Sequence, residues 1–350
     1  MSTGNILTLN CGSTSIKYRV FSAELDELAS SQIEGVTDFE KAIKDILRQV
    51  VSTGQITTII HRVVHGGQNF FKPTLVNSEV IKELEKNNHL APLHNPFNIL
   101  GIKTVAEFLP DAKQIAVFDT GFFHHLPKVA QNYALPKKIV EDFSIRRYGF
   151  HGLSHEYISR EGKKELKLKT GGNFIVAHLG GGCSISAIRD GKPIETSMGY
   201  TPIEGLVMMS RPGDLDSNLV LDLIEGLPGE INSAKIKTVR DLLNRQSGIK
   251  ALSGYTDFRD LLRDANLGKT DAKFAFDIFI HRLIKYIGAY YTLLEGKIDA
   301  IILTGSIGSG NPITKEELKT KLRFINKPII SIATNEELMM TLLAKEAKLL

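Results

Sequence analysis

Short apolar runs alternate along nearly the whole chain with segments whose apolar residues recur at helical spacing. The runs predict strands near 5–10, 17–22, 57–64, 114–118, 174–179, 183–189, 299–304 and 328–333. The helical spacing predicts helices near 39–51, 78–88, 97–108, 155–166, 216–225, 236–245, 271–294 and 335–348. This alternation is typical of an α/β fold whose strands lie at the centre of the sheets.

Two segments far apart in the chain share one pattern. Both ILTLNCGSTSIKYRVFSAELDELAS (6–30) and FIVAHLGGGCSISAIRDGKPIETS (174–197) read as an apolar strand, a Gly/Ser turn, an alternating strand, a second turn and a third strand. We therefore predict two similar domains. We expect their Gly/Ser hairpins to face a shared cleft and to hold a polyphosphate through backbone N–H groups.

The segment 271–294, DAKFAFDIFIHRLIKYIGAYYTLL, is apolar around most of its helical circumference. Such a helix is buried between layers or lies at a subunit interface rather than on an open surface. We expect a dimer contact there.

The chain has 350 residues, more than the roughly 250–300 at which single cores stop growing, so two domains are expected. Its 42% apolar and 23% charged residues are ordinary for a globular protein and exclude a disordered or fibrous class. The net charge of +4 comes from 43 basic and 39 acidic residues without a basic run, and tryptophan is absent. Nucleic-acid binding is therefore not expected.

Membrane and export signals are also missing from the sequence. No apolar stretch is long enough to cross a bilayer, and MSTGNILTL lacks the charge and apolar core of a signal peptide. We expect no membrane partner and a cytoplasmic location. Cys11 and Cys183 lie in Gly/Ser-rich turns, which are poor places for a structural disulfide, so both thiols should be free.

The first Gly/Ser turn, residues 10–15, has two interpretations. It is either a hairpin turn in which Gly12 supplies a positive φ, or a cradle of donors for an anion. Asn10 and Lys17 on either side favour a phosphate or its magnesium ion. The second turn, 178–184, contains three consecutive glycines, which favour close approach of a ligand over simple tolerance.

Two common nucleotide-binding motifs are absent from the sequence. Residues 265–270 end in Gly-Lys-Thr like a P-loop, but Arg263 stands where the first glycine is needed and no strand precedes. This segment is interpreted as a loop between helices. No dinucleotide fingerprint follows the first strand, which argues against a nicotinamide enzyme.

Charged residues occur where predicted strands end. Arg62 lies near the carboxyl end of a buried strand, so it either binds an anion or forms a buried ion pair. Asp119 ends the apolar run 115–118 and has an Asx-turn with Thr120 as its alternative. Arg211 lies on a turn.

Histidines recur in the first half of the chain, at 94, 124, 125, 151 and 155. His124 and His125 are interpreted as loop or core residues. His151 and His155 have the spacing of zinc ligands on one helix. However, Ser154 resembles a helix cap that follows His151, so the two side chains need not share a face.

Several longer motifs together point to one family. They are NCGSTSIK (10–17), HRVVHGG (61–67), APLHNP (91–96), VFDTGF (117–122), YGFHGLSH (148–155), HLGGGCS (178–184), ETSMGYTPIEGL (195–206), DFRDL (257–261) and TNEEL (334–338). With these the chain resembles the acetate/propionate kinases of the actin-like and sugar-kinase superfamily.

The resemblance implies two duplicated actin-like (ribonuclease H-like) α/β domains with mixed central sheets and an active-site cleft between them. The first would span 1–150 and include the C-terminal helix 335–350, and the second would span 151–334. The implied reaction is reversible, direct in-line phosphoryl transfer from ATP to acetate, giving acetyl phosphate and ADP. Mg²⁺ would be the cofactor, with Mn²⁺ as a substitute, and the protein would be a homodimer.

The resemblance also implies roles for individual residues. The catalytic group would be Arg62, Asp119, His151 and Arg211. The acetate site would comprise Arg62, Val64, Leu93, His94, Phe150 and Pro202, and the metal ligands would be Asn10 and Glu336. The nucleotide site would comprise Ser13, Ser15, Lys17, His178, Leu179, Gly180, Gly181, Gly182, Asp257, Phe258, Arg259, Ser306, Ile307, Gly308, Ser309 and Gly310.

The chain departs from the family in two glycine-rich segments. The family's Leu-Gly-Asn-Gly is Leu-Gly-Gly-Gly at 179–182, so a side-chain amide is missing at Gly181. Its Gly-Ile-Gly-Glu-Asn is Ser-Ile-Gly-Ser-Gly at 306–310, and the segment from there to 334 is shorter than usual. ATP remains the favoured donor, with GTP or pyrophosphate as alternatives, and propionate or another short carboxylate is the alternative acceptor.

Two other classes of protein are alternatives. A sugar or polyol kinase would need polar groups, including a catalytic carboxylate, where Val64, Leu93, Phe150 and Pro202 are apolar. A non-catalytic nucleotide-binding regulator would not need the intact set Arg62, Asp119, His151 and Arg211. The residues present argue against both.

Overall fold

The computed structural model describes residues 4–12, 14–52 and 54–350, which form two compact units. Unit 1 comprises Met1–His124, Phe150–Tyr157 and Asn335–Leu350, and unit 2 comprises His125–Gly149 and Ile158–Thr334. The division differs from the predicted boundary at 150. The cause is local packing, because Leu153 lies in a unit 1 core with Ile6 and Met339, whereas Arg147 bonds the backbone of Thr196 and Ser197 in unit 2.

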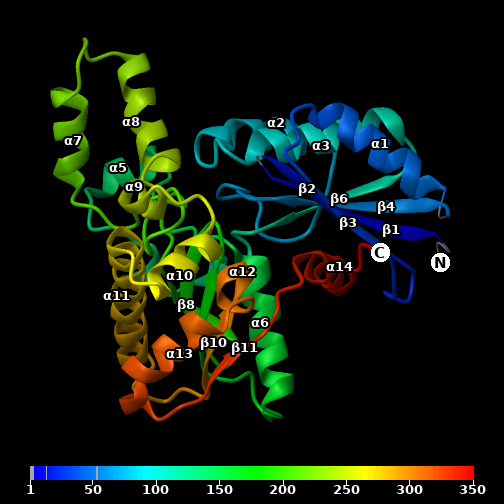
Figure 1. Cartoon of the computed structure of the whole chain (residues 1–350). Coiled ribbons are helices and arrows are strands. Elements are labelled where there is room, and N and C mark those ends of the chain that lie inside the picture. Colours follow the sequence, from blue (N-terminus) through cyan, green and yellow to red (C-terminus); the bar gives the residue numbers. More distant parts are fainter. Residues whose placement is uncertain (1–3, 13, 53) are drawn as a thin grey trace. The chain divides into compact units, whose positions relative to one another are not determined.

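The sheet of unit 1 has the strand order β3-β2-β1-β4-β6-β5 (Figure 1). Its strands are β1 (Asn5–Cys11), β2 (Ser15–Phe21), β3 (Glu27–Glu34), β4 (Ile56–Val63), β5 (Thr74–Leu75) and β6 (Lys113–Phe118). Strands β1, β4 and β6 are parallel, whereas β2, β3 and β5 pair antiparallel with their neighbours. The sheet is therefore mixed.

Helices cover both faces of this sheet (Figure 1). They are α1 (Phe39–Val51), α2 (Ser78–Lys86), α3 (Asn95–Phe108), α14 (Glu336–Glu346) and the start of α6 (Gly152–Glu165). Alternate residues of a strand point to opposite faces. Accordingly Ile59 packs with α1 and α3, whereas Ile60 packs with Met339 and Met340 of α14. The central strands β1, β4 and β6 are mostly buried, as their apolar runs predict, whereas β3 has no buried residue.

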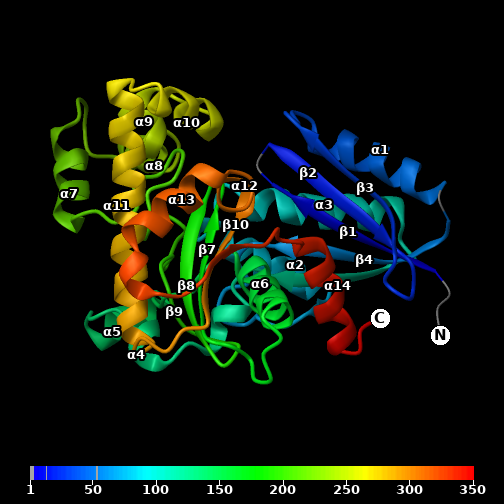
Figure 2. The ribbon, with the colours of Figure 1, turned by 60° about the horizontal axis from the view of Figure 1, so that its bottom comes forward.

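The sheet of unit 2 has the order β11-β10-β7-β8-β9 (Figure 2). Its strands are β7 (Phe174–Leu179), β8 (Cys183–Arg189), β9 (Lys192–Thr196), β10 (Ala300–Thr304) and β11 (Ile329–Ser331). Strands β7, β8 and β9 form an antiparallel meander and β10 and β11 are parallel to β7. This repeats the connectivity of β1, β2, β3, β4 and β6, so the predicted duplication is confirmed.

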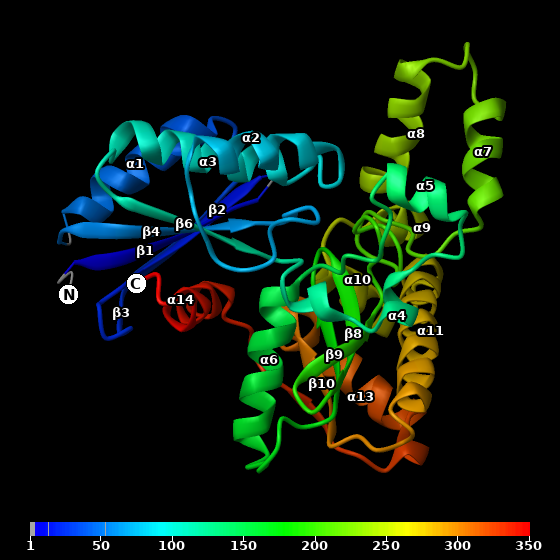
Figure 3. The ribbon, with the colours of Figure 1, turned by 180° about the vertical axis from the view of Figure 1, so that it is seen from behind.

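Unit 2 carries most of the remaining helices. They are α4 (Lys128–Gln131), α5 (Lys137–Asp142), α7 (Ser217–Gly226), α8 (Ser233–Arg245), α9 (Gly248–Ser253), α10 (Phe258–Asn266), α11 (Thr270–Leu293), α12 (Gly305–Gly308) and α13 (Pro312–Lys321). Helices α7 and α8 extend from the sheet of unit 2 as a hairpin (Figure 3). The segment 265–270 joins α10 to α11, as predicted for a loop between helices.

Helix α11 is buried along one stripe rather than around its whole circumference. Phe276, Phe279 and Leu283 lie on the buried side, and Phe274 is 56% exposed. Helix α11 is therefore not buried between layers on all sides. No helix among the described residues is long and apolar enough to cross a membrane.

Candidate active site

Three neighbouring strands of unit 1 place polar side chains at one edge of its sheet. Asn10 lies near the end of β1, Arg62 near the end of β4, and Asp119 directly follows β6. Because these strands are parallel, their carboxyl ends share an edge, which is where open α/β sheets hold ligands. The sequence prediction that Arg62 and Asp119 both lie at strand ends is confirmed.

The Arg62 guanidinium is bound by three side chains. Its Nε donates to both oxygens of Asp119 at 3.2 and 3.1 Å, and its Nη2 donates to Asp119 Oδ2 at 2.5 Å. Its Nη1 donates to Asn10 Oδ1 at 3.1 Å and to Glu336 Oε2 at 3.3 Å. Arg62 therefore forms the buried ion pair that was one of its two interpretations.

Helix α14 supplies two adjacent carboxylates to this network. Asn335 caps the helix by accepting the Leu338 N–H at 3.0 Å, which fixes Glu336 and Glu337 in the first turn. Asn10 Nδ2 donates to Glu336 at 3.5 Å and to Glu337 at 3.2 Å. Glu337 was not among the residues predicted from the sequence, because its contact with Asn10 depends on the packing of α14 against β1.

Burial and charge act in opposite directions on the central pair. Burial raises the pKa of the Asp119 carboxyl, and the Arg62 guanidinium opposes that shift. Burial lowers the pKa of Arg62, but Asp119 and Glu336 together raise it above its usual value. Arg62 thus keeps its charge, and a charged guanidinium at a strand end is suited to bind a carboxylate or phosphate.

Two buried asparagines hold the end of β4. Asn98 Oδ1 accepts the Val64 N–H at 3.0 Å, and its Nδ2 donates to Cys11 O at 2.7 Å. Asn95 bonds the backbone N–H and C=O of His65 at 3.0 and 2.9 Å. These residues, also missed by the sequence analysis, fix Val64 next to Arg62. Their i, i+3 spacing after a proline-flanked turn was the available signal.

The residues expected to line an apolar pocket do not all lie in one unit. Val64 and Phe150 are buried in unit 1, where Leu93 is half-buried ahead of α3 with His94 next to it. Phe150 contacts the His65 ring edge-on, with the centroids 5.5 Å apart. Pro202 is buried in unit 2.

The zinc interpretation of His151 and His155 finds no support. Among the described residues, no group of three or more His, Cys, Asp or Glu side chains is placed to hold a metal ion. His151 has φ +57° and precedes α6, which begins at Gly152. Ser154 is therefore inside the helix, and its predicted capping role is wrong.

The first Gly/Ser turn is a hairpin between β1 and β2. Asn10 lies opposite Lys17 in the register, and the Gly12 N–H donates to Ser15 O at 2.8 Å. Gly12 does not have the positive φ that the hairpin-turn interpretation gave it. Ser13 lies outside the described residues. The pairing places Asn10 and Lys17 next to each other.

The second Gly/Ser turn connects β7 and β8, with Leu179 opposite Cys183. Neither Gly180 nor Gly181 has a positive φ. A Cβ atom on Gly181 would meet nothing within 4 Å, and on Gly180 nothing closer than 3.6 Å. Neither backbone conformation nor packing requires glycine at these two positions, which leaves approach of a ligand as its explanation.

Arg211 lies near this hairpin in unit 2. Its Nη1 donates to Pro202 O at 3.2 Å and lies 3.8 Å from Met208 Sδ, while its Nε is buried without a hydrogen-bond partner among the described residues. Burial lowers the pKa of this guanidinium. A buried cation without a carboxylate partner is suited to an anionic ligand.

Cys183, like Cys11, is a buried free thiol, as predicted, and burial raises the pKa of both thiols to about 12.

Residues expected at the nucleoside lie elsewhere in unit 2. Asp257 caps α10 through the Arg259 N–H at 2.8 Å and pairs with the Arg259 side chain. Phe258 is buried against Phe279, with ring centroids 4.9 Å apart, so it belongs to the core. Residues 306–310 form α12 and the turn after it, with Ser306 and Gly310 exposed.

Comparison with known proteins gives consistent results. Residues 27–337 match the model of the family described as the Acetokinase family. Acetate kinase of Streptomyces coelicolor is 40% identical, with 90% of this chain and 84% of that protein covered. Acetate kinase of Carboxydothermus hydrogenoformans is 36% identical, with 97% and 98% covered.

Solved structures agree with the sequence matches. A propionate kinase from Francisella tularensis has a TM-score of 0.87 at 34% identity, with 98% of this chain and 99% of that chain covered. An acetate kinase from Porphyromonas gingivalis has a TM-score of 0.85 at 31% identity, with 99% of each chain covered. A ROK family protein from Streptococcus pneumoniae, with a TM-score of 0.52 at 15% identity, shares the fold alone.

Proposed function

The chain belongs to the acetokinase family, and we propose that it catalyses the reversible, direct transfer of a phosphoryl group from ATP to acetate, giving acetyl phosphate and ADP. The observation that supports this most directly is the Arg62 network. It places a charged guanidinium, two carboxylates and a carboxamide at the carboxyl edge of the unit 1 sheet.

In this proposal Arg62 binds the carboxylate of acetate, and Val64, Leu93, Phe150 and Pro202, with His94, surround its methyl group. A carboxylate is already ionised at neutral pH and needs no strong general base to attack the γ-phosphorus. Positioning and charge neutralisation suffice. Because Asp119 accepts three hydrogen bonds from Arg62, it is proposed to orient that arginine rather than to accept a proton.

The proposed metal ion is Mg²⁺, with Mn²⁺ as a substitute, and it would neutralise charge on the transferring phosphoryl group. Glu336 and Asn10 would hold it. Their oxygen atoms are the ligand type that Mg²⁺ prefers, and Asp119, Glu336 and Glu337 outnumber the arginines Arg62 and Arg19 beside them. Mg²⁺ typically takes only one or two protein carboxylates and completes its shell with phosphate oxygens and water, which suits this donor set.

The phosphates of ATP would be bound by backbone N–H groups of the hairpin 178–182 and by Lys17 and Ser15, with Ser13 assigned by sequence alone. Arg211 and His151 would stabilise the phosphoryl group during transfer. Asp257, Arg259 and residues 306–310 would hold the nucleoside, and the burial of Phe258 limits it to supporting them. Without an amide at Gly181, the hairpin offers backbone donors only.

Two alternatives within the same chemistry have specific support. Propionate is favoured as a second acceptor by the likeness to a propionate kinase structure, because one methylene in an apolar pocket changes binding by only about 1–3 kcal/mol. GTP or pyrophosphate is the alternative donor, because residues 306–310 depart from the family's nucleoside segment.

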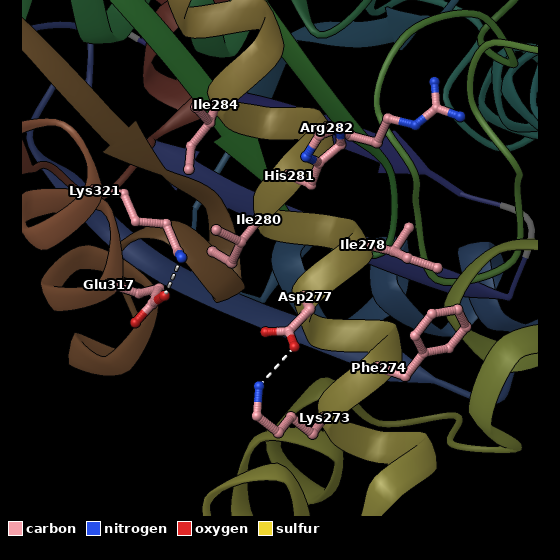
Figure 4. A pocket seen from close by; sticks show the side chains of 10 residues that line it. All are labelled: Lys273, Phe274, Asp277, Ile278, Ile280, His281, Arg282, Ile284, Glu317 and Lys321. Carbon is pink, nitrogen blue, oxygen red and sulfur yellow. Dashed lines mark hydrogen bonds and ion pairs between the residues drawn. The ribbon is translucent and has the colours of Figure 1, made fainter.

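We also propose that the protein is a cytoplasmic homodimer. Its two buried free cysteines are typical of a reducing compartment. Helix α7 has no buried residue, although it carries Leu219 and Leu221, which are 44% and 57% exposed. Apolar side chains also line a hollow of about 630 Å³ between α11 and α13, where Lys273 pairs with Asp277 and Lys321 with Glu317 (Figure 4). Light scattering of Leu221→Glu and Phe274→Glu would test the dimer, with monomers as the expected result.

The decisive experiment traps acyl phosphate with hydroxylamine. Acetate, propionate and butyrate are each combined with ATP, GTP and pyrophosphate in the presence of Mg²⁺. Acetyl hydroxamate with ATP is expected to form fastest. Absence of acyl hydroxamate with every donor would contradict the kinase proposal, and a faster reaction with another pair would reassign the substrates.

A further inference from the structure

The direction of the Arg211 guanidinium depends on its backbone. Among the described residues no carboxylate lies within ion-pair distance of it, and its Nη1 contacts one carbonyl and one thioether. Because so few side-chain contacts restrict the rotamers of Arg211, the position of its main chain sets the region that the guanidinium can reach. The segment 205–214, here named the Arg211 loop, therefore decides where this cation lies.

Asp214 closes the Arg211 loop at its base. The Gly205 N–H donates to Asp214 Oδ1 at 2.8 Å, and the Asp214 N–H donates to Gly205 O at 3.0 Å. The second carboxylate oxygen accepts the Tyr286 hydroxyl of α11 at 2.8 Å. One carboxylate thus joins both ends of the loop and fastens them to the long helix of unit 2.

The rest of the loop is fixed by main-chain bonds. The Met208 N–H donates to Arg211 O at 3.0 Å inside the loop, and the Ser247 N–H donates to Ser210 O at 3.1 Å. The Met209 N–H donates to Gly181 O at 3.3 Å, which connects the loop to the glycine hairpin. The loop is a preformed unit whose open ends are joined at Asp214.

We propose that Asp214, held by Tyr286, is a positioning residue for Arg211. The proposal rests on the proposed function, which gives Arg211 the stabilisation of the transferring phosphoryl group. Without the carboxylate the loop ends can separate and carry the guanidinium away from its place. A displacement of about 1 Å in a positioned group can cost on the order of a hundredfold in rate.

The test compares substitutions of Asp214 and Tyr286 with the substitution of a nearby acid. Asp214→Ala removes both hydrogen bonds of the carboxylate, and Tyr286→Phe removes one of them. Asp214→Asn keeps an acceptor for the Gly205 N–H. Asp216→Ala is the control, because Asp216 is exposed and caps α7 through the Asn218 N–H at 2.9 Å. Hydroxamate formation gives kcat and KM for acetate and ATP, and thermal melting reports folding.

We expect Asp214→Ala to lower kcat by about ten- to a hundredfold with the KM for acetate within about twofold. Tyr286→Phe should lower kcat by a few fold, Asp214→Asn should recover most of the loss, and Asp216→Ala should leave kcat unchanged. In an Arg211→Ala background, Asp214→Ala and Tyr286→Phe should have no further effect on kcat, because residues that act through one another are not additive.

The outcomes separate this proposal from the function it rests on. If Arg211→Ala lowers kcat but Asp214→Ala and Tyr286→Phe do not, the positioning role is wrong and the proposed function stands. Equal losses in both backgrounds would likewise overturn it. If Arg211→Ala itself keeps full kcat, the role proposed for Arg211 fails, and the positioning role fails with it. Should Asp214→Ala not fold, Tyr286→Phe, with Tyr291→Phe of the same helix as its control, decides the question.

Discussion

Arg62 and Arg211 are both assigned to bind anions, but they are held in place by different means. Arg62 is bound by the side chains of Asp119, Asn10 and Glu336 at 2.5 to 3.3 Å. Arg211 has no carboxylate partner among the described residues and is oriented by a loop whose base is joined by Asp214. One arginine is positioned by ion pairs and the other by main-chain geometry.

This difference has consequences for stability and binding. A buried ion pair stabilises its partners' charges, so removing one member leaves the other charge buried and uncompensated. An arginine without a carboxylate partner compensates no charge within the protein, and its charge is available to an anionic ligand. We therefore expect substitution of either arginine to lower catalysis, but only substitution of Arg62 to leave buried charges unpaired and so to lower stability as well.

The first prediction substitutes each arginine by alanine. Both variants should lose roughly 10²- to 10³-fold in kcat/KM, the effect of removing one preorganised donor. Only Arg62→Ala should also lose about 3–5 kcal/mol of unfolding free energy, because Asp119 and Glu336 then lie unpaired. Urea-induced unfolding measures the difference, with Arg48→Ala, an exposed arginine paired to Asp45, as the control. Equal stability of the two variants would contradict the comparison.

The second prediction concerns acid. His61, next to Arg62 in β4, is 2% exposed, and burial lowers its pKa from 6.5 to about 4. Between these values the unfolded chain binds the proton more readily than the folded chain, so stability falls as the pH drops from 6.5 to 4, by about 3 kcal/mol. Above pH 6.5 both states are neutral and the effect vanishes. His61→Gln should flatten the urea-unfolding profile over this range, and an unchanged profile would contradict the prediction.

The positions of Arg62 and Asp119 could be predicted because they depend on local pattern and one general rule. An apolar run fixes a strand, and parallel strands end at one edge. The duplicated meander could be predicted for the same reason, since its turns recur in the sequence. The family motifs then gave those positions chemical roles.

The supporting residues could not be predicted, because their partners are distant in sequence. Asn98 bonds Cys11 across 87 positions, and Asn10 meets Glu337 across 327. Asp214 meets Tyr286 across 72. Such pairs follow from packing, and no local pattern in the sequence identifies the partner of either residue. Gly12 shows the opposite limit of local rules, because the positive φ that the hairpin-turn interpretation gave it does not occur in this hairpin.

The third prediction strains the Arg211 loop itself. Gly213 has φ +74°, and a Cβ atom there would lie 2.4 Å from Gly205 O and 2.7 Å from Leu206 O. Since both contacts are backbone, Gly213→Ala should cost about 1–3 kcal/mol in stability and should also lower kcat. Gly226→Ala is the matched control, because a Cβ atom there meets nothing within 4 Å and Gly226 has no positive φ. Chemical denaturation and hydroxamate assays measure both effects. An unchanged kcat in Gly213→Ala would mean that the loop tolerates movement.

The smallest predicted effect lies at the glycine hairpin. Because nothing lies within 4 Å of a Cβ atom at Gly181, Gly181→Asn should fold with wild-type stability. It would restore the side-chain amide that this position has in the resembling family and add one hydrogen bond to a phosphate, worth about 0.5–1.5 kcal/mol. The KM for ATP should then fall by about two- to tenfold at constant kcat. If pyrophosphate gains as much as ATP, the amide contacts phosphate alone. If the KM for ATP rises, ATP itself needs the space that the glycine leaves open. The hairpin then binds ATP through main-chain groups, just as main-chain bonds hold the Arg211 loop.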